Sequence, residues 1–393
     1  MQLINGNRQV RRRKRKINWR FNIMMGLRFY FCLMVLCASL MIPTQCLGRH
    51  ICLPEEHVAL FIFGDSIIDA GNNNYISTTT VLQANVWPYG ESYFKYPSGR
   101  PSDGRLIPDF IAEYLKLPLI PPYLHPGYHR YTDGANFASA GAGALVETRR
   151  GLVIDLHTQF HYFEKMERLL RQKLGEAETK TLLSRAVYLI SIGTNDYLVT
   201  FANSSTLQYS YSREEYVDMV IGNMTTVIKE IHKKGGRKFA FLNLEPAGCI
   251  PLAKAIKPEI GGACLEELTA LVKLHNKALS HVLQMLETQL KGFKYSHADL
   301  YTFVTERIND PLKYGFKEGK KACCGSGSYR ENLNCGKGTL TEDYKLCGNP
   351  SEYVFFDAAH PTEKAYQQLA KLMWDGELNV TWPYGIKALI EDK

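Results

Sequence analysis

The chain has 393 residues and a formal net charge of +8, which is enough length to bury a large core in one or two α/β domains. Nine basic residues and no acidic residue lie within 1–48, so the rest of the chain carries 38 basic against 39 acidic side chains. A chain that is nearly neutral after residue 48 lacks the basic surface that binds nucleic acids. We therefore expect no nucleic-acid partner.

Residues 1–48 have the organisation of a targeting segment. A long basic stretch precedes an apolar run of 14 residues at 29–42, and a plausible cleavage zone follows at 46–50. This run is short for a membrane span, which needs about 20 residues. We predict a cleaved leader over 1–48 and a secreted, extracellular mature protein without a stable membrane span. An uncleaved signal anchor stays open as an alternative, and Met24 or Met25 would give a leader of ordinary length if translation began there.

Cysteines and glycosylation sequons after the leader agree with export. Six cysteines lie among small and polar residues, namely Cys249, Cys264, Cys323, Cys324, Cys335 and Cys347. Clusters of this kind in a secreted chain indicate disulfides. The first two can close one loop and the other four can form two bridges of open pairing, while Cys52 is free or paired outside this scheme. Asn203, Asn223 and Asn379 stand in sequons and are predicted glycosylation sites.

The first structural signal after the leader is the apolar run 58–63, which is typical of a strand buried on both faces. It ends at Gly64-Asp65-Ser66, and a hydroxyl residue directly after a buried strand lies at the edge where open α/β sheets bind ligands. An ordinary helix cap uses the same residue types, so this turn alone does not distinguish a nucleophile from a cap.

Two segments rich in glycine and proline or alanine come next. Residues 85–124 predict a long loop with a short helix around 108–115, and the charged residues Arg100, Asp103 and Arg105 in it could touch a substrate or form a local salt-bridge network. The segment 133–145 leaves backbone amides uncovered, which suits either an anion-binding turn or tight backbone packing.

The remaining chain alternates helices and strands. Helices are expected at 156–183, 216–232 and 266–290, and strands at 186–192, 238–244 and 293–300. The short apolar stretch 353–356 precedes Asp357 and His360, and Pro361 can start a last helix. This alternation predicts a parallel sheet covered on both faces, within a single domain over 49–393.

Polar turns are therefore expected at four strand ends: at Ser66, at the segment ending in Gly141, at 193–196 and at 357–360. Acyl transfer at neutral pH needs a hydroxyl nucleophile, a base, a group that orients the base and donors aimed at the developing oxyanion. The four turns together contain each of these groups. No convincing set of metal ligands is present, and we expect neither a metal nor another cofactor.

Four stretches carry a specific resemblance: FGDSIIDAGNNN at 63–74, GANFASAGAGAL at 134–145, SIGTNDY at 191–197 and FFDAAHPTEKAY at 355–366. In these stretches and their order, the chain resembles plant GDSL-type esterases/lipases of the SGNH hydrolase superfamily, from about residue 57 to 376. The resemblance implies a three-layer α/β/α sandwich of flavodoxin-like type with a five-stranded parallel sheet.

The resemblance also implies roles for individual residues. Ser66 matches the nucleophile, His360 the general base and Asp357 its partner. Oxyanion donors are implied at Ser66, Gly141 and Asn195, with Gly143 as a competing position for the second. The G-x-S-x-G elbow of the other large esterase fold is absent from the chain.

The function implied is cleavage of carboxylic esters through an acyl-enzyme on Ser66, by a monomer acting on a small-molecule or lipid ester. The same resemblance leads us to expect a role in plant defence or lipid metabolism. Two alternatives stay open: an acyltransferase that uses the same acyl-enzyme, and a secreted binding or defence protein without turnover. The sequence does not identify the ester.

Overall fold

The structure is a computed structural model that describes residues 53–54, 56–202, 211–258, 261–337, 343–377 and 379–391. The predicted leader, the cleavage zone, Cys52 and the sequon at Asn203 lie outside the described residues. Residues Pro54–Lys393 form one compact unit. Among the helices of the described ranges, none is long and apolar enough to cross a membrane.

A six-stranded sheet with the order β2-β1-β3-β4-β5-β8 forms the centre of this unit. Its five parallel strands are β1 (Leu60–Gly64), β2 (Gly134–Asn136), β3 (Val187–Ser191), β4 (Lys238–Leu242) and β5 (Lys294–Ala298). The predicted five-stranded parallel sheet is confirmed. One further strand, β8 (Thr381–Pro383), joins β5 in the antiparallel direction, and its proline fits an edge position.

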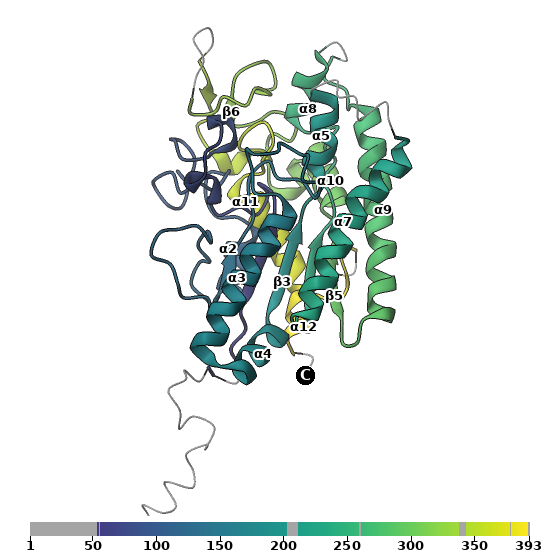
Figure 1. Ribbon diagram of the computed structural model, residues 1–393. Helices are drawn as coiled ribbons and strands as arrows, with labels where there is room; N and C mark the ends of the chain where they lie inside the picture. The colour runs from purple at the N-terminus through teal and green to yellow at the C-terminus, as the bar shows by residue number, and fades with distance from the viewer. Residues whose placement is uncertain are drawn as a thin grey trace, which may run out of the picture. The chain divides into compact units, whose positions relative to one another are not determined.

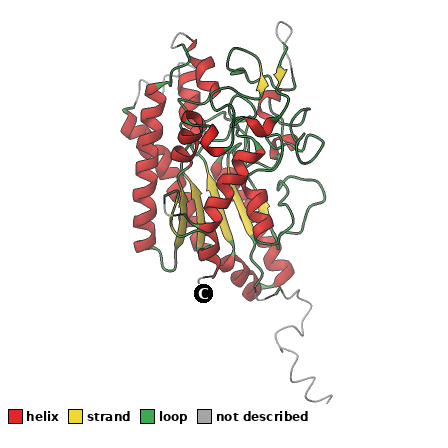
Figure 2. Ribbon diagram, turned by 180° about the vertical axis from the view of Figure 1, so that it is seen from behind, coloured by secondary structure: helices red, strands yellow, loops and turns green. Residues whose placement is uncertain are grey.

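Helices cover both faces of the sheet (Figures 1 and 2). One layer contains α3 (Leu156–Leu174), α7 (Arg213–Lys233) and α9 (Glu266–Gln289), and the other contains α2 (Ile107–Tyr114), α11 (Glu363–Asp375) and α12 (Ile386–Glu391). Further helices are α4 (Glu176–Arg185), α5 (Thr194–Ala202), α8 (Pro251–Ile256) and α10 (Leu300–Asn309). The predicted three-layer α/β/α sandwich is therefore confirmed.

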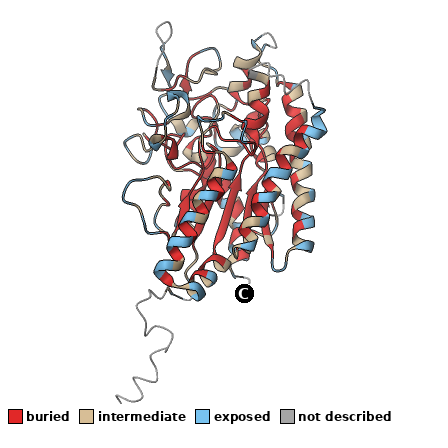
Figure 3. Cartoon of the chain, in the orientation of Figure 1, coloured by how far each residue is buried: buried red, intermediate tan, exposed pale blue. Residues whose placement is uncertain are grey.

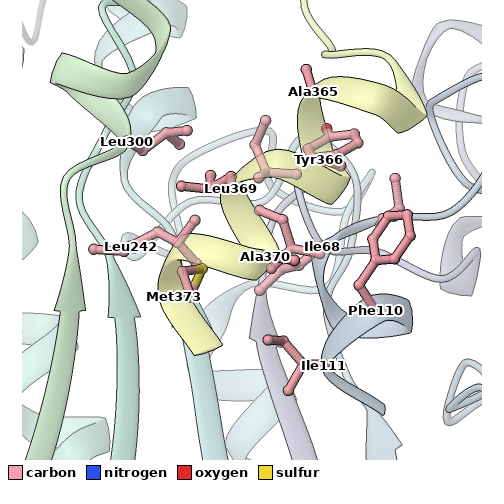
Figure 4. Close-up of a cluster of buried hydrophobic side chains, with 14 of the residues drawn as sticks. Ile68, Phe110, Ile111, Leu242, Leu300, Ala365, Tyr366, Leu369, Ala370 and Met373 are labelled. Atoms are coloured by element: carbon pink, nitrogen blue, oxygen red, sulfur yellow. The ribbon is translucent and has the colours of Figure 1, made fainter. Parts of the chain in front are cut away.

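The two faces of the sheet carry different cores because successive residues of a strand point to opposite sides. Phe61 and Phe63 of β1 lie against Phe163 of α3, with ring centroids 5.5 and 5.7 Å apart. Leu60 and Ile62 belong instead to the mainly aliphatic hydrophobic cluster beneath α2 and α11, which also contains Phe110 and Tyr366 and part of which is shown in Figure 4. The five parallel strands are buried along nearly their whole length, whereas the helices expose their outer sides (Figure 3).

The glycine-rich segment begins as an edge strand rather than as a turn. β2 pairs with β1 in parallel, and the turn follows it. A Cβ on Gly134 would lie 1.9 Å from the carbonyl oxygen of Leu60, and the residue has φ +124°. Only glycine allows so close an approach of the two backbones.

The expectation that the turn 357–360 follows a strand of the sheet is wrong. Residues 353–356 lie outside the sheet, and their backbone groups bond to the cysteine-rich loop, residues 321–350. The amide of Cys323 donates to the carbonyl of Phe355 at 2.9 Å, and the amide of Cys324 donates to that of Phe356 at 2.7 Å. These bonds satisfy the backbone without a sheet neighbour.

Three disulfides join the six cysteines considered above. Cys249 pairs with Cys264, as predicted, and the four cysteines of the loop pair as Cys323–Cys347 and Cys324–Cys335. Two short strands, β6 (Cys324–Gly325) and β7 (Lys345–Leu346), pair within the same loop. The loop that holds residues 353–356 is thus cross-linked twice.

Candidate active site

A cavity of about 300 Å³ lies at the carboxyl edge of the sheet. Ser66 follows β1, Gly141 lies in the loop after β2, and Asn195 lies in the first turn of α5 after β3. These three residues and His360 all line the cavity. Asp357 lies behind His360, so the tertiary structure brings all five predicted residues to one place.

Contacts of Gly64 and Gln159 fix the position of the turn that contains Ser66. Gly64 donates its amide to Oε1 of Gln159 and accepts from Nε2 of the same side chain, each at 2.8 Å. A Cβ on Gly64 would lie 2.1 Å from the carbonyl oxygen of Ser191 on β3. The close approach of these strands therefore needs glycine here, and it fixes where Ser66 leaves the sheet.

Asp65, next to Ser66, is buried and accepts the amide of Ile67 at 3.1 Å. Burial and the nearby carboxylate of Glu245 raise the pKa of Asp65 well above its usual value. Asp65 therefore shapes the turn and adds a buried acid to the cavity wall.

The side chains of Asp357 and His360 form a hydrogen-bonded pair. Nδ1 of His360 lies 2.8 and 2.9 Å from the two carboxylate oxygens of Asp357, and the hydroxyl of Tyr89 donates to Oδ2 at 2.7 Å. Burial alone would raise the pKa of Asp357, but the charge of His360 and the hydrogen bonds from His360 and Tyr89 outweigh it and hold this pKa below its usual value. An ionised carboxylate only accepts, so Nδ1 carries the proton and Nε2 remains as the basic nitrogen.

The side-chain amide of Asn195 is held at both ends. Nδ2 donates to the carbonyl of Ala142 at 3.0 Å, and Oδ1 accepts from Nη1 of Arg149 at 2.6 Å. The same guanidinium nitrogen donates to the carbonyl of Gly141 at 2.9 Å. Gly141 lines the cavity, whereas a Cβ on Gly143 would run into Asp196, so the structure favours Gly141 over Gly143 as the glycine that faces a ligand.

Two buried carboxylates fix the loop that contains Gly141. Oδ2 of Asp69 accepts the amide of Ala140 at 2.9 Å, and Asp196 accepts the amides of Ala144 and Leu145 at 2.9 and 3.1 Å. Burial raises the pKa of both Asp69 and Asp196 to about 6, against the effect of these hydrogen bonds. The loop is anchored on each side of Gly141.

Three residues of the site were not singled out from the sequence: Tyr89, Arg149 and Glu245. Glu245 is buried in the cavity wall, accepts from the hydroxyl of Thr194 at 3.1 Å and has its pKa raised by burial. A polar residue shortly after a buried strand marks Glu245, just as it marks Ser66. No comparable pattern marks the other two residues, which reach the site from loops.

The remaining sequence candidates lie elsewhere. Arg100 pairs with Asp109 at 2.8 Å, and Arg105 pairs with Glu113 and Glu363, so the salt-bridge interpretation holds for these arginines. Asp103 accepts from Ser92 and from the amide of Glu363. The sequon residues Asn223 and Asn379 are exposed.

A three-layer α/β/α sandwich with a serine and an aspartate-paired histidine at one cavity on the carboxyl edge of the sheet has an arrangement that suits a serine hydrolase. The model of the GDSL-like Lipase/Acylhydrolase family matches residues 60–373. The chain is 54% identical over 342 residues to "GDSL esterase/lipase 1" of Arabidopsis thaliana, covering 86% of this chain and 91% of that protein. It is 51% identical over 359 residues to "GDSL lipase" of Tanacetum cinerariifolium, covering 91% and 93%.

The chain belongs to the GDSL-like lipase/acylhydrolase family. It is a serine hydrolase that acts on carboxylic ester bonds.

Proposed function

We propose that this hydrolase works through an acyl-enzyme on Ser66, with His360 as the base and Asp357 as the group that orients it. The observation that carries the proposal is the 2.8 Å bond between Asp357 and Nδ1 of His360, in a ring that lines the same cavity as Ser66. This bond leaves Nε2 of His360 to take the serine proton.

In the first step, Oγ of Ser66 attacks the ester carbonyl carbon while Nε2 of His360 takes the hydroxyl proton. His360 then gives this proton to the departing alcohol oxygen as the ester C–O bond breaks, which leaves the acyl group on Ser66. Water attacks the acyl-enzyme in the same manner, and the carboxylic acid and free Ser66 are the products. Every proton passes through His360, so the proposed steps require no cofactor.

The oxyanion formed during each attack needs donors that are already in place. We assign this role to the amides of Ser66 and Gly141 and to Nδ2 of Asn195. The carbonyl of Ala142 takes one of the two Nδ2 protons of Asn195, so the other is available to a ligand. Support comes from the position of all three residues on the cavity wall.

The lining of the cavity favours an ester with an apolar acyl group. Eight leucine, isoleucine and valine side chains line it: Ile67, Val81, Leu82, Leu152, Leu198, Ile250, Leu252 and Leu333. Its volume is at the lower end of the range of small-molecule sites, about 300–1,000 Å³. We propose export of the mature protein on the basis of its basic-apolar leader and three disulfides, and a defence or lipid-metabolism role remains part of this proposal.

Hydrolysis of 4-nitrophenyl butyrate by the wild type and by Ser66→Ala tests the mechanism. The variant should lose at least about 10³-fold in kcat, because it lacks the hydroxyl that forms the acyl-enzyme. A fluorophosphonate probe should label the wild type at Ser66 and leave the variant unlabelled. Equal turnover by the two proteins would refute the serine mechanism, and an inactive wild type would favour a binding role.

A further inference from the structure

Arg149 makes an unusual set of contacts for a half-buried arginine at a cavity wall. Its Nη1 donates to the carbonyl of Gly141 at 2.9 Å and to Oδ1 of Asn195 at 2.6 Å. Within the described ranges its hydrogen bonds go to these two oxygens and none goes to a carboxylate. Both partners are residues to which the proposed function assigns oxyanion donors.

The contacts of Asn195 fix which way its amide faces. Arginine only donates, so the atom of Asn195 that faces Arg149 must be the oxygen. The carbonyl of Ala142 only accepts, so the atom that faces it must be the nitrogen. An amide that flipped by 180° would lose both bonds, and Nδ2 would then point away from the position it needs for an oxyanion.

The backbone of Arg149 shows that this arrangement is held against a local cost. Its φ is +49°, in the left-handed region that residues other than glycine rarely adopt. Such conformations persist where surrounding contacts determine them, and they are frequent at active sites. The next residue, Arg150, has the same side chain but is exposed.

We propose that Arg149 is a positioning residue of the oxyanion hole, which orients and polarises the Asn195 amide and holds the Gly141 peptide. A hydrogen bond from a cation to Oδ1 withdraws electron density from the amide and makes Nδ2–H a stronger donor. Its bond to the carbonyl of Gly141 fixes the following peptide, whose N–H belongs to Ala142 and donates to the carbonyl of Ser139 at 3.0 Å, and so holds the backbone next to the Gly141 amide. This inference rests on the proposed function, because it assumes that Asn195 and Gly141 face the oxyanion.

The proposal predicts that Arg149 acts through Asn195. Removal of a single oxyanion donor lowers kcat by about 10²–10³-fold, and this is the expected effect of Asn195→Ala. Arg149→Met keeps most of the apolar stem and removes the donors, and it should lower kcat by about 10- to 100-fold with KM changed by less than about threefold. Arg150→Met is the matched control and should behave as the wild type.

A double-mutant cycle distinguishes positioning from a general structural role. In the Asn195→Ala background the further loss caused by Arg149→Met should shrink to less than about threefold, because the amide it orients is absent and only its contact with the Gly141 carbonyl remains. An equal loss in both backgrounds would overturn the proposal, as would a change confined to KM, which would indicate substrate binding. Activity of Arg149→Met equal to that of Arg150→Met would overturn it as well.

Circular dichroism and thermal melts establish that each variant is folded at the assay temperature. If Arg149→Met does not fold, Arg149→Lys, which keeps the charge and fewer donors, replaces it in the same cycle. A kcat loss that shrinks in the Asn195→Ala background again supports the proposal, and an additive loss or no loss overturns it. Full activity of Ser66→Ala would instead refute the proposed function, so the two failures are distinguishable.

Discussion

The Asp357 carboxylate is buried and accepts hydrogen bonds from four groups. They are Nδ1 of His360, the hydroxyl of Tyr89 and the backbone amides of Ala359 and His360. A buried charge is tolerated only where it is paired and hydrogen-bonded, and these contacts meet that condition. Tyr89 is the one of these donors that comes from a distant part of the chain.

Tyr89→Phe should therefore weaken both stability and turnover. The loss of one hydrogen bond to a buried carboxylate should lower the free energy of unfolding by about 1–3 kcal/mol, as measured by urea denaturation. The pKa of Asp357 should rise, because the bond from Tyr89 helps to hold it down, and kcat should fall by less than about tenfold since His360 keeps its own bond.

Tyr96→Phe is the control for Tyr89→Phe, because the side chain of Tyr96 is 61% exposed. It should leave both quantities unchanged within error. If Tyr89→Phe proved as stable as this control, Tyr89 would be no more than a neighbour of the carboxylate.

At the scale of elements, the turn 357–360 depends on the cysteine-rich loop rather than on the sheet. The amides of Cys323 and Cys324 bond to Phe355 and Phe356, and their side chains pack with Tyr89 and Phe356. The Cys323–Cys347 disulfide closes this loop over a separation of 24 residues. The disulfide therefore stabilises the loop against which the turn with His360 is positioned.

Cys323→Ser combined with Cys347→Ser should lower the free energy of unfolding by about 3 kcal/mol, through the loop-closure entropy that the unfolded chain regains. Residual esterase activity should disappear at a lower temperature than global structure does, since the His360 turn loosens first. Parallel melts followed by activity and by circular dichroism provide the measurement.

The number of free thiols tests the disulfides of the cysteine-rich loop independently. Thiol titration of the unfolded, unreduced mature protein should count one free thiol at most, which would be Cys52. Several free thiols, or a double variant as stable as the wild type, would contradict the role assigned to the cross-linked loop.

At the scale of the whole molecule, buried titrating groups with opposite effects set the response to acid. Burial lowers the pKa of His275 to about 3 and that of His297 to about 4, from 6.5. As the pH falls below 6.5, these two histidines bind protons in the unfolded chain but stay neutral in the folded protein. The free energy of unfolding therefore falls. Asp69 and Asp196, with a pKa raised from 3.8 to about 6, bind protons first in the folded state and therefore stabilise it over the same range.

His297→Leu should make the protein less sensitive to acid. In the described part of the chain neither ring nitrogen of His297 has a hydrogen-bond partner, and the ring lies 4.7 Å from that of Trp382. Between pH 7 and 5 the wild type should lose roughly 2 kcal/mol of unfolding free energy more than the variant. Urea denaturation at each pH measures this difference, and parallel curves for the two proteins would contradict it.

The sequence predicted the long elements well and the short ones poorly. β1, β3, β4 and β5 lie within two residues of their expected bounds. The signal for β1, β3 and β4 is the predominantly apolar run that is typical of buried parallel strands. The single helical region expected at 156–183 is divided by Gly175 into α3 and α4. β8 has only three residues, one of them proline, and so carries almost no periodic signal.

The sequence by itself determined the family, the parallel sheet and the residues expected to meet at its carboxyl edge, since the ends of parallel strands converge whatever the loops do. Only the tertiary structure decided that Gly141 rather than Gly143 faces the cavity and that residues 357–360 stand on the cysteine-rich loop. It also brought Tyr89 to Asp357 and Arg149 to Asn195. These contacts depend on the paths of irregular loops, for which a local pattern of polar and apolar residues holds no information.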